Sequence, residues 1–123
     1  MEKILSIDWW SKYIWLARSD ASGFIYPVGF IENDSESIIY ICNIIWLHNI
    51  SYIVIGKPKS PKIIAQIEKF ARQIYISTNI QPEFIDENYT TVAAKAITGI
   101  YTKSTINDVV SAMEILKRKL QKN

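Results

Sequence analysis

The most constraining feature of this sequence is a change in the spacing of its apolar residues near position 35. Before that point, residues 3–7, 13–17 and 24–31 form three short runs rich in β-branched and aromatic side chains, which predict three strands. The connections are short, and residues 20–23 have the composition of a turn. Three consecutive strands joined in this way predict an antiparallel meander.

After position 35 the spacing becomes helical. Asp34 or Ser35 is a typical helix cap, and the apolar residues that follow it at helical spacing are Ile38, Ile39, Cys42, Ile45 and Trp46. Residues 52–55 are a β-branched run that stops at Gly56, which predicts a strand buried on both faces. The chain therefore turns from strands alone to an alternation of helices and strands.

The same alternation continues to the end of the chain. Ser60 followed by Pro61 is typical of a helix start, and the apolar stripe expected on that helix is Ile63, Ile67, Phe70 and Ile74. Residues 82–85 predict a fifth strand, and Thr90 or Thr91 begins a small helix that closes at Gly99. A last helix opens near Thr105, with an inward stripe of Val109, Met113, Leu116 and Leu120.

This order of elements predicts an α/β fold. We expect a mixed five-stranded sheet, made of an antiparallel meander of three strands plus two parallel strands, flanked by helices. The strand of residues 3–7 should be central, with the strand of residues 52–55 parallel beside it. The length of 123 residues suits one domain covering residues 1–123. The single cysteine, Cys42, excludes an internal disulfide framework, and no secretory or membrane-spanning segment is evident, so we expect a cytoplasmic protein without a membrane partner.

The charge is unevenly divided along the chain. Residues 1–56 hold three basic and six acidic side chains, whereas residues 57–123 hold eleven basic and six acidic ones, so the halves carry −3 and +5. A basic half attracts a polyanion such as nucleic acid, although an ordinary solvated surface explains the asymmetry equally well.

Four carboxylates stand at the ends of predicted elements. Asp8 ends the first strand, Asp86 and Glu87 end the last strand, and Asp108 opens the final helix. Carboxylates that converge at one edge of a sheet repel one another unless a cation lies between them, and their oxygens suit Mg²⁺ or Mn²⁺. Taken singly, each acid is more typical of a turn or of the first turn of a helix than of a metal site. His48 lies near a helix end and Cys42 on an apolar stripe, so we expect structural roles for both.

The flanking residues of these acids resemble the YqgF/RuvX family. The matching segments, in the family's order, are residues 4–8 with 12–20, residues 52–58, residues 86–94 and residues 107–116. The resemblance covers nearly the whole chain and implies an RNase H-like fold. Members are assigned to pre-16S rRNA processing and were once described as Holliday-junction resolvases. Sugar kinases of the actin-like superfamily also begin with a strand and Asp-x-Gly, but this length excludes their two domains.

The resemblance implies roles for particular residues. Asp8, Glu87 and Asp108 correspond to the family's catalytic, metal-binding acids, with Asp86 as a supporting acid and Mg²⁺ or Mn²⁺ as cofactor. The expected partner is structured RNA, in particular pre-rRNA, or branched DNA, and the expected protein is a monomer or a homodimer. Candidate nucleic-acid contacts are Lys12, Lys57, Lys59, Lys62 and Trp10. The alternatives are a DNA resolvase and a non-catalytic nucleic-acid-binding relic.

Three residues depart from the family pattern. Trp10 and Trp15 stand where the family has glycines, and Asn88 replaces an arginine. A glycine permits close approach of backbone and ligand. Trp10 therefore obstructs the site, stacks on an unpaired base, or packs in the core. For Trp9 the alternatives are stacking on an unpaired base and packing in the core.

Overall fold

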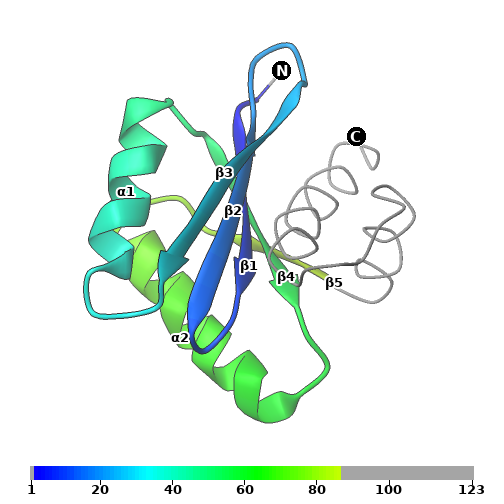
Figure 1. The fold of residues 1–123 in the computed structure, drawn as a ribbon, viewed down its shortest axis with the longest axis vertical. Helices are drawn as coiled ribbons and strands as arrows, with labels where there is room; N and C mark the ends of the chain where they lie inside the picture. Colours follow the sequence, from blue (N-terminus) through cyan, green and yellow to red (C-terminus); the bar gives the residue numbers. More distant parts are fainter. Residues whose placement is uncertain (1, 87–123) are drawn as a thin grey trace.

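Five strands form one mixed sheet in the computed structural model, which describes residues 2–86 (Figure 1). The strands are β1 (Ile4–Trp9), β2 (Tyr13–Ser19), β3 (Ile25–Glu32), β4 (Tyr52–Lys57) and β5 (Glu83–Asp86), and their order across the sheet is β3-β2-β1-β4-β5. The pairs β1–β2 and β2–β3 are antiparallel, whereas β1–β4 and β4–β5 are parallel. This confirms the predicted meander, the central position of the first strand and the two parallel strands beside it.

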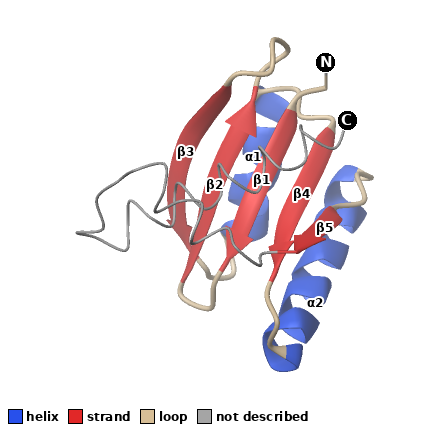
Figure 2. Cartoon of the chain, turned by 90° about the vertical axis from the view of Figure 1, so that its right-hand side faces the viewer, coloured by secondary structure: helices blue, strands red, loops and turns tan. Residues whose placement is uncertain are grey.

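Both described helices, α1 (Ser37–Leu47) and α2 (Pro61–Thr78), pack on the same face of the sheet (Figure 2). The core beneath them joins alternate residues of the central strands to the inner faces of the helices. Its fully buried members include Leu5, Ile7, Ile53, Ile55, Ile41, Ile67 and Ile74. Because side chains alternate along a strand, the intervening residues of β1 lie on the opposite face, among them Ile4, Ser6 and Asp8.

Helix α2 confirms its predicted start and stripe. Ser60 is the residue before the first helical turn and Pro61 opens that turn, where its missing N–H costs no hydrogen bond. Ile67, Phe70 and Ile74 are buried. The helix ends at Asn79, whose left-handed φ of 62° closes the last turn.

The residue that precedes α1 is Glu36, one position after Ser35 and two after Asp34, the two predicted caps. Asp34 does not cap the helix, because its Oδ1 accepts the N–H of Glu36 at 2.9 Å in a turn that precedes it. The Oγ of Ser37 completes this turn: it accepts the N–H of Asp34 at 2.8 Å and donates to the carbonyl of Glu32 at 2.9 Å. Glu36 therefore occupies the N-cap position, and Ser37 is the first residue of the helix.

The predicted inner stripe of α1 was wrong at two positions. Ile39 and Trp46 are 64% and 62% exposed, whereas Ile41 and Ile44 are buried together with Cys42 and Ile45. The helix carries so many apolar residues that their spacing alone does not define one face. Packing against the sheet selects the buried set.

Three strands are longer than predicted, and the first of them is β2, which runs to Ser19 rather than Ala17. β4 does not stop at Gly56, because Gly56 and Lys57 pair with Ile85 and Asp86 of β5. β1 continues through Asp8 and Trp9, whose partners on β2 are Trp15 and Ile14. Asp8 therefore lies inside the strand rather than in the following turn.

Several expectations fall outside the described residues. The small helix after Thr90 or Thr91 and the final helix with its stripe both lie in the segment 87–123. In the part of the chain that the structure describes, neither helix combines the length and the apolar character needed to cross a lipid bilayer.

Candidate functional site

Asp8 is the centre of the candidate site. Its side chain is 1% exposed, and it is the only charged side chain among the buried residues of the segment 2–86. Burying a carboxylate costs free energy, which its partners have to offset. A buried ionisable side chain near the end of a central strand is a candidate for chemistry.

The position of Asp8 along β1 also favours a functional role. Asp8 is the last residue but one of β1. The carboxyl end of β1 lies at the same edge of the sheet as those of the parallel strands β4 and β5 (Figure 1). Clefts in α/β folds open at this edge. Asp86 is the last residue of β5, and its backbone partner is Lys57.

Glu87 and Asp108 lie outside the described residues, so their convergence with Asp8 stays a prediction. Within residues 2–86, no group of three or more Asp, Glu, His or Cys side chains is arranged to hold a metal ion. Of the three predicted metal-binding acids, only Asp8 lies among the described residues.

The three tryptophans around Asp8 have different environments. Trp15, the cross-strand partner of Asp8, is 4% exposed, and its ring centroid lies 4.7 Å from that of Phe30. Trp9 is 9% exposed and belongs to the core under the helices, which confirms the core-packing alternative for this residue. Trp10 is 49% exposed in the turn after β1, so core packing is wrong for Trp10.

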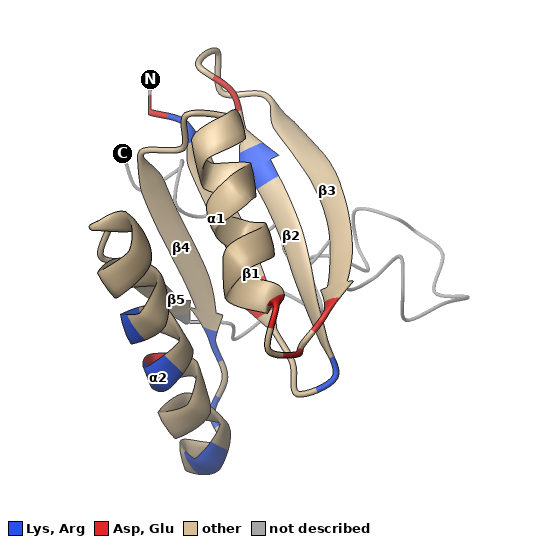
Figure 3. Ribbon diagram, turned by 90° about the vertical axis from the view of Figure 1, so that its left-hand side faces the viewer, with Lys and Arg blue, Asp and Glu red and all other residues tan. Residues whose placement is uncertain are grey.

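The predicted basic contacts gather near the same edge. Lys12 lies in the β1–β2 turn, Lys57 ends β4, Lys59 follows it, and Lys62 lies in the first turn of α2. Figure 3 shows Lys and Arg at this end of the sheet and along α2. Lys57 is not on the Asp8 face: its Nζ lies 5.9 Å from the ring centroid of Phe84, a residue that packs against the helix-side core.

His48 and Cys42 have the structural roles expected of them. His48 is the residue at which α1 ends, and partial burial, with help from the charges of Arg18 and Lys3, lowers its pKa. Cys42 is buried, and loss of solvent raises the pKa of its thiol. A thiol with a raised pKa is a poor nucleophile, so Cys42 takes no part in the candidate site.

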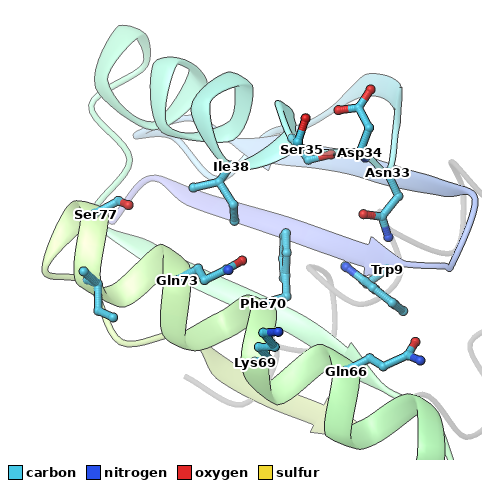
Figure 4. Close-up of a pocket in the computed structure, with 12 residues that line it drawn as sticks. Trp9, Asn33, Asp34, Ser35, Ile38, Gln66, Lys69, Phe70, Gln73 and Ser77 are labelled. Atoms are coloured by element: carbon cyan, nitrogen blue, oxygen red, sulfur yellow. Dashed lines mark hydrogen bonds between the residues drawn. The ribbon is translucent and has the colours of Figure 1, made fainter.

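A groove between the helices was missed by the sequence analysis. It encloses about 680 Å³ between the start of α1 and the middle of α2, and Trp9 and Phe70 line it (Figure 4). The strand alternation that turns Asp8 to one face turns Trp9 to the other. That alternation was the signal in the sequence that could have revealed the groove.

Comparison with known proteins identifies the family. The sequence profile of RuvX, described as a Holliday junction resolvase, matches residues 2–122. The chain belongs to the RuvX family. The resemblance read from the motifs around Asp8 is thereby confirmed.

Two curated relatives support the RuvX assignment, and each carries the name "Putative pre-16S rRNA nuclease". The protein from Dictyoglomus turgidum is 32% identical over 103 residues, which are 77% of this chain and 73% of the relative. The protein from Carboxydothermus hydrogenoformans is 34% identical over 107 residues, 77% of this chain and 75% of the relative.

Solved structures support the fold of this RuvX chain. Thermus thermophilus RuvC in complex with a Holliday junction substrate matches with a TM-score of 0.62 at 5% identity, covering 98% of this chain and 96% of that one. The fowlpox virus resolvase in complex with Holliday junction DNA also gives 0.62, at 11% identity, covering 98% and 97%. These likenesses confirm the RNase H-like fold.

Proposed function

We propose that this chain is a metal-dependent nuclease that hydrolyses phosphodiester bonds in structured RNA, in the processing of the 5′ end of pre-16S rRNA. The observation that carries the proposal is the buried carboxylate of Asp8 at the carboxyl end of the central strand. Membership of the RuvX family and the names of the two curated relatives support this choice of reaction and substrate.

The residues present suit Mg²⁺ or Mn²⁺. Hard divalent cations prefer carboxylate oxygens, and Asp8 supplies one such ligand in a position with little solvent. Glu87 and Asp108 would complete the ligand set, with Asp86 in support. When bound, two such ions lower the pKa of an attacking water and neutralise charge on the leaving oxygen.

The chain's own residues bind and position the substrate. Lys12, Lys59 and Lys62 lie around the carboxyl edge of the sheet, where their ammonium groups attract backbone phosphates irrespective of base sequence. Asp8 is 1% exposed and its cross-strand partner Trp15 is also buried, so bulk water has little access to the carboxylate of Asp8. Fewer competing waters strengthen every electrostatic contact made there.

Substitution of Asp8 by Asn tests the proposal. The two side chains are nearly isosteric, so Asp8→Asn keeps the fold but removes a metal ligand. We expect Mg²⁺-dependent cleavage of a pre-16S rRNA fragment to fall by at least about 100-fold, while binding measured in chelator is unchanged or slightly tighter. Asp20→Asn is the matched control, because it removes the same charge at the β2–β3 turn, at the opposite end of the sheet. Equal cleavage by Asp8→Asn and wild type would contradict the catalytic role.

A second candidate substrate is branched DNA. The profile that matches this chain is described as a Holliday junction resolvase, and two solved proteins of the same fold are complexes with Holliday junctions. A parallel assay with a four-way DNA junction separates the two substrates. Tight binding of RNA or DNA without cleavage in Mg²⁺ or Mn²⁺ would instead identify a non-catalytic binding protein.

A further inference from the structure

The groove between α1 and α2 contains a buried hydrogen-bond donor that the described chain does not use. Trp9 is nine-tenths buried, and within residues 2–86 its Nε1 has no hydrogen-bond partner. Figure 4 shows this nitrogen on the side of the indole that faces Phe70 and the groove. Leaving a buried donor unsatisfied is costly, and a ligand that offers an acceptor removes the cost.

The walls of the groove combine apolar surface with groups that bind polar ligands. Ile38 and the rings of Trp9 and Phe70, whose centroids are 6.3 Å apart, form the apolar part. Gln66, Lys69 and Gln73 contribute two amides and one cation from α2, and Asp34 contributes a carboxylate from the opposite wall (Figure 4). A flat heterocycle with acceptors and donors on its edge matches this lining, and the volume of about 680 Å³ admits a base with its sugar and phosphate.

A line of side chains on α2 connects the groove to the edge where β4 ends. Lys62, Gln66, Lys69 and Gln73 follow one another at intervals of four, three and four residues, so they share one face of the helix, and all four are exposed. None of them is acidic, and the two lysines are spaced for backbone phosphates. The stripe begins in the first turn of α2, close to Lys57 and Lys59.

The groove is also tied to the turn that follows Asp8. The amide of Asn33, which lines the groove, donates through Nδ2 to the carbonyl of Trp10 at 2.7 Å. Three consecutive residues thus have three environments: Asp8 lies on the face of the candidate metal site, Trp9 lines the groove, and Trp10 is exposed in the turn after β1.

We infer that the groove binds an unpaired nucleotide of a single-stranded segment that flanks the cleaved structure. The base enters over Phe70 and accepts a hydrogen bond from Nε1 of Trp9, the glutamine amides contact its edge, and Lys69 and Lys62 hold the adjoining phosphates. This inference rests on the proposed nuclease function, because it assigns to that nuclease a substrate with a single-stranded overhang next to its duplex.

The first test uses the indole N–H of Trp9 as a probe. In a ¹H–¹⁵N spectrum of the full chain with chelator present, Trp9→Phe identifies the Trp9 Nε1–H signal by its loss. We expect that signal to shift when a six-nucleotide single-stranded RNA is added, and to stay in place with a blunt RNA hairpin. Adenosine monophosphate is a further probe: a shift with the mononucleotide as well supports base recognition. No shift with any single-stranded probe would overturn the inference.

The second test compares two cations on the same helix. Lys69 lines the groove, whereas Arg72 lines a different cavity beside Glu68 and Phe84. In chelator, we expect Lys69→Gln to weaken binding of a hairpin with an overhang by roughly 2- to 10-fold and to flatten its salt dependence, with no effect on the blunt hairpin. Arg72→Gln is the matched control and leaves the preference for the overhang intact. Equal effects of the two variants would overturn the inference.

The outcomes separate this inference from the nuclease proposal. Cleavage of structured RNA that needs Asp8, without any preference for an overhang, would overturn the groove as a nucleotide site while leaving the nuclease intact. A shifted Trp9 signal and a lost overhang preference in Lys69→Gln, without cleavage in Mg²⁺ or Mn²⁺, would support the groove and contradict the nuclease.

Discussion

Trp9 and Trp10 show how strongly one residue's environment depends on its place along a strand. Trp9 is the last residue of β1 and packs under the helices, whereas Trp10 follows it in the turn and is 49% exposed. The two indoles are chemically identical, so only the end of the strand separates a core residue from a surface residue. Trp10 also stands where the RuvX resemblance expects glycine.

We expect Trp10→Gly to weaken binding of RNA with unpaired bases. An exposed indole beside a basic edge stacks on bases, which contributes about 1–3 kcal/mol per base, equivalent to roughly 5- to 150-fold in affinity. Fluorescence anisotropy in chelator measures the loss, with a blunt hairpin as the control substrate. Increased Mg²⁺-dependent cleavage with unchanged affinity would show instead that Trp10 obstructs the site.

The carboxylate of Asp20 is held by four hydrogen bonds in the turn between β2 and β3. Its Oδ1 accepts hydrogen bonds from the hydroxyl and the N–H of Ser22 and from the N–H of Phe24, and its Oδ2 accepts one from the Tyr26 hydroxyl. The hydroxyl of Ser22 contributes most, and together these bonds lower the pKa of Asp20 to about 2.

The lowered pKa predicts the direction of a pH effect. Because the folded state holds Asp20 ionised below its ordinary pKa of 3.8, its stabilising effect is complete above that value and is lost as the pH falls towards 2. We expect urea unfolding of wild type to lose stability between pH 4 and pH 2 more steeply than that of Asp20→Asn. Parallel pH profiles for the two proteins would show that these bonds do not form in solution.

At the scale of elements, the sequence of α1 does not show which face of the helix is buried, and packing against the sheet decides it. The helix carries no charged side chain between Ser37 and Leu47, so charge does not mark its outer face. The sequence analysis assigned Ile39 to the inner stripe, whereas the structure leaves Ile39 64% exposed and buries Ile41 completely.

Two matched substitutions test this orientation. We expect Ile41→Ala to lower the free energy of unfolding by about 2–5 kcal/mol, because it leaves a cavity in the core. Ile39→Ala removes the same atoms from an exposed position, so we expect a change within about 0.5 kcal/mol. Urea denaturation measures both. Equal losses would mean that Ile39 is buried in solution, against a partner or within the fold.

At the scale of the described molecule, four lysines share one end of the sheet with acidic side chains, among them Glu32, Asp34 and Glu36 (Figure 3). Lys12, Lys57, Lys59 and Lys62 lie near the carboxyl ends of β1 and β4, together with the buried acid Asp8. A negative carboxylate would repel a polyanion if it stood alone, so surrounding cations are needed to bring phosphates to this end.

We expect the double variant Lys57→Ala, Lys59→Ala to weaken RNA binding regardless of sequence. Each lost phosphate contact reduces the slope of log affinity against log salt by about 0.7–0.9, so the double variant flattens it by roughly one to two. A Lys3→Ala, Arg18→Ala variant removes two charges from the opposite end of β1 and β2 and serves as the control. Identical slopes for the two double variants would exclude a localised binding edge.

Much of the fold could be predicted from the sequence, because strand and helix periodicity are local properties. The three β-rich runs, the spacing of Ile67, Phe70 and Ile74, and the Ser60-Pro61 start each depend on neighbours within about four residues. The short connections between these strands predicted the antiparallel meander, which the structure confirms together with the central place of the first strand. The RuvX resemblance added the fold family and singled out Asp8.

Tertiary structure alone decided the features that depend on contacts between distant residues. β4 extends through Gly56 because β5, nearly thirty residues later, pairs with it. Packing of α1 against the sheet buries Ile41 and leaves Ile39 exposed. The groove forms where α1 and α2 approach each other above Trp9. The sequence by itself determined which residues are able to form strands, helices and a metal site. Which of them meet depended on long-range packing, because no local pattern records how two separated segments approach each other.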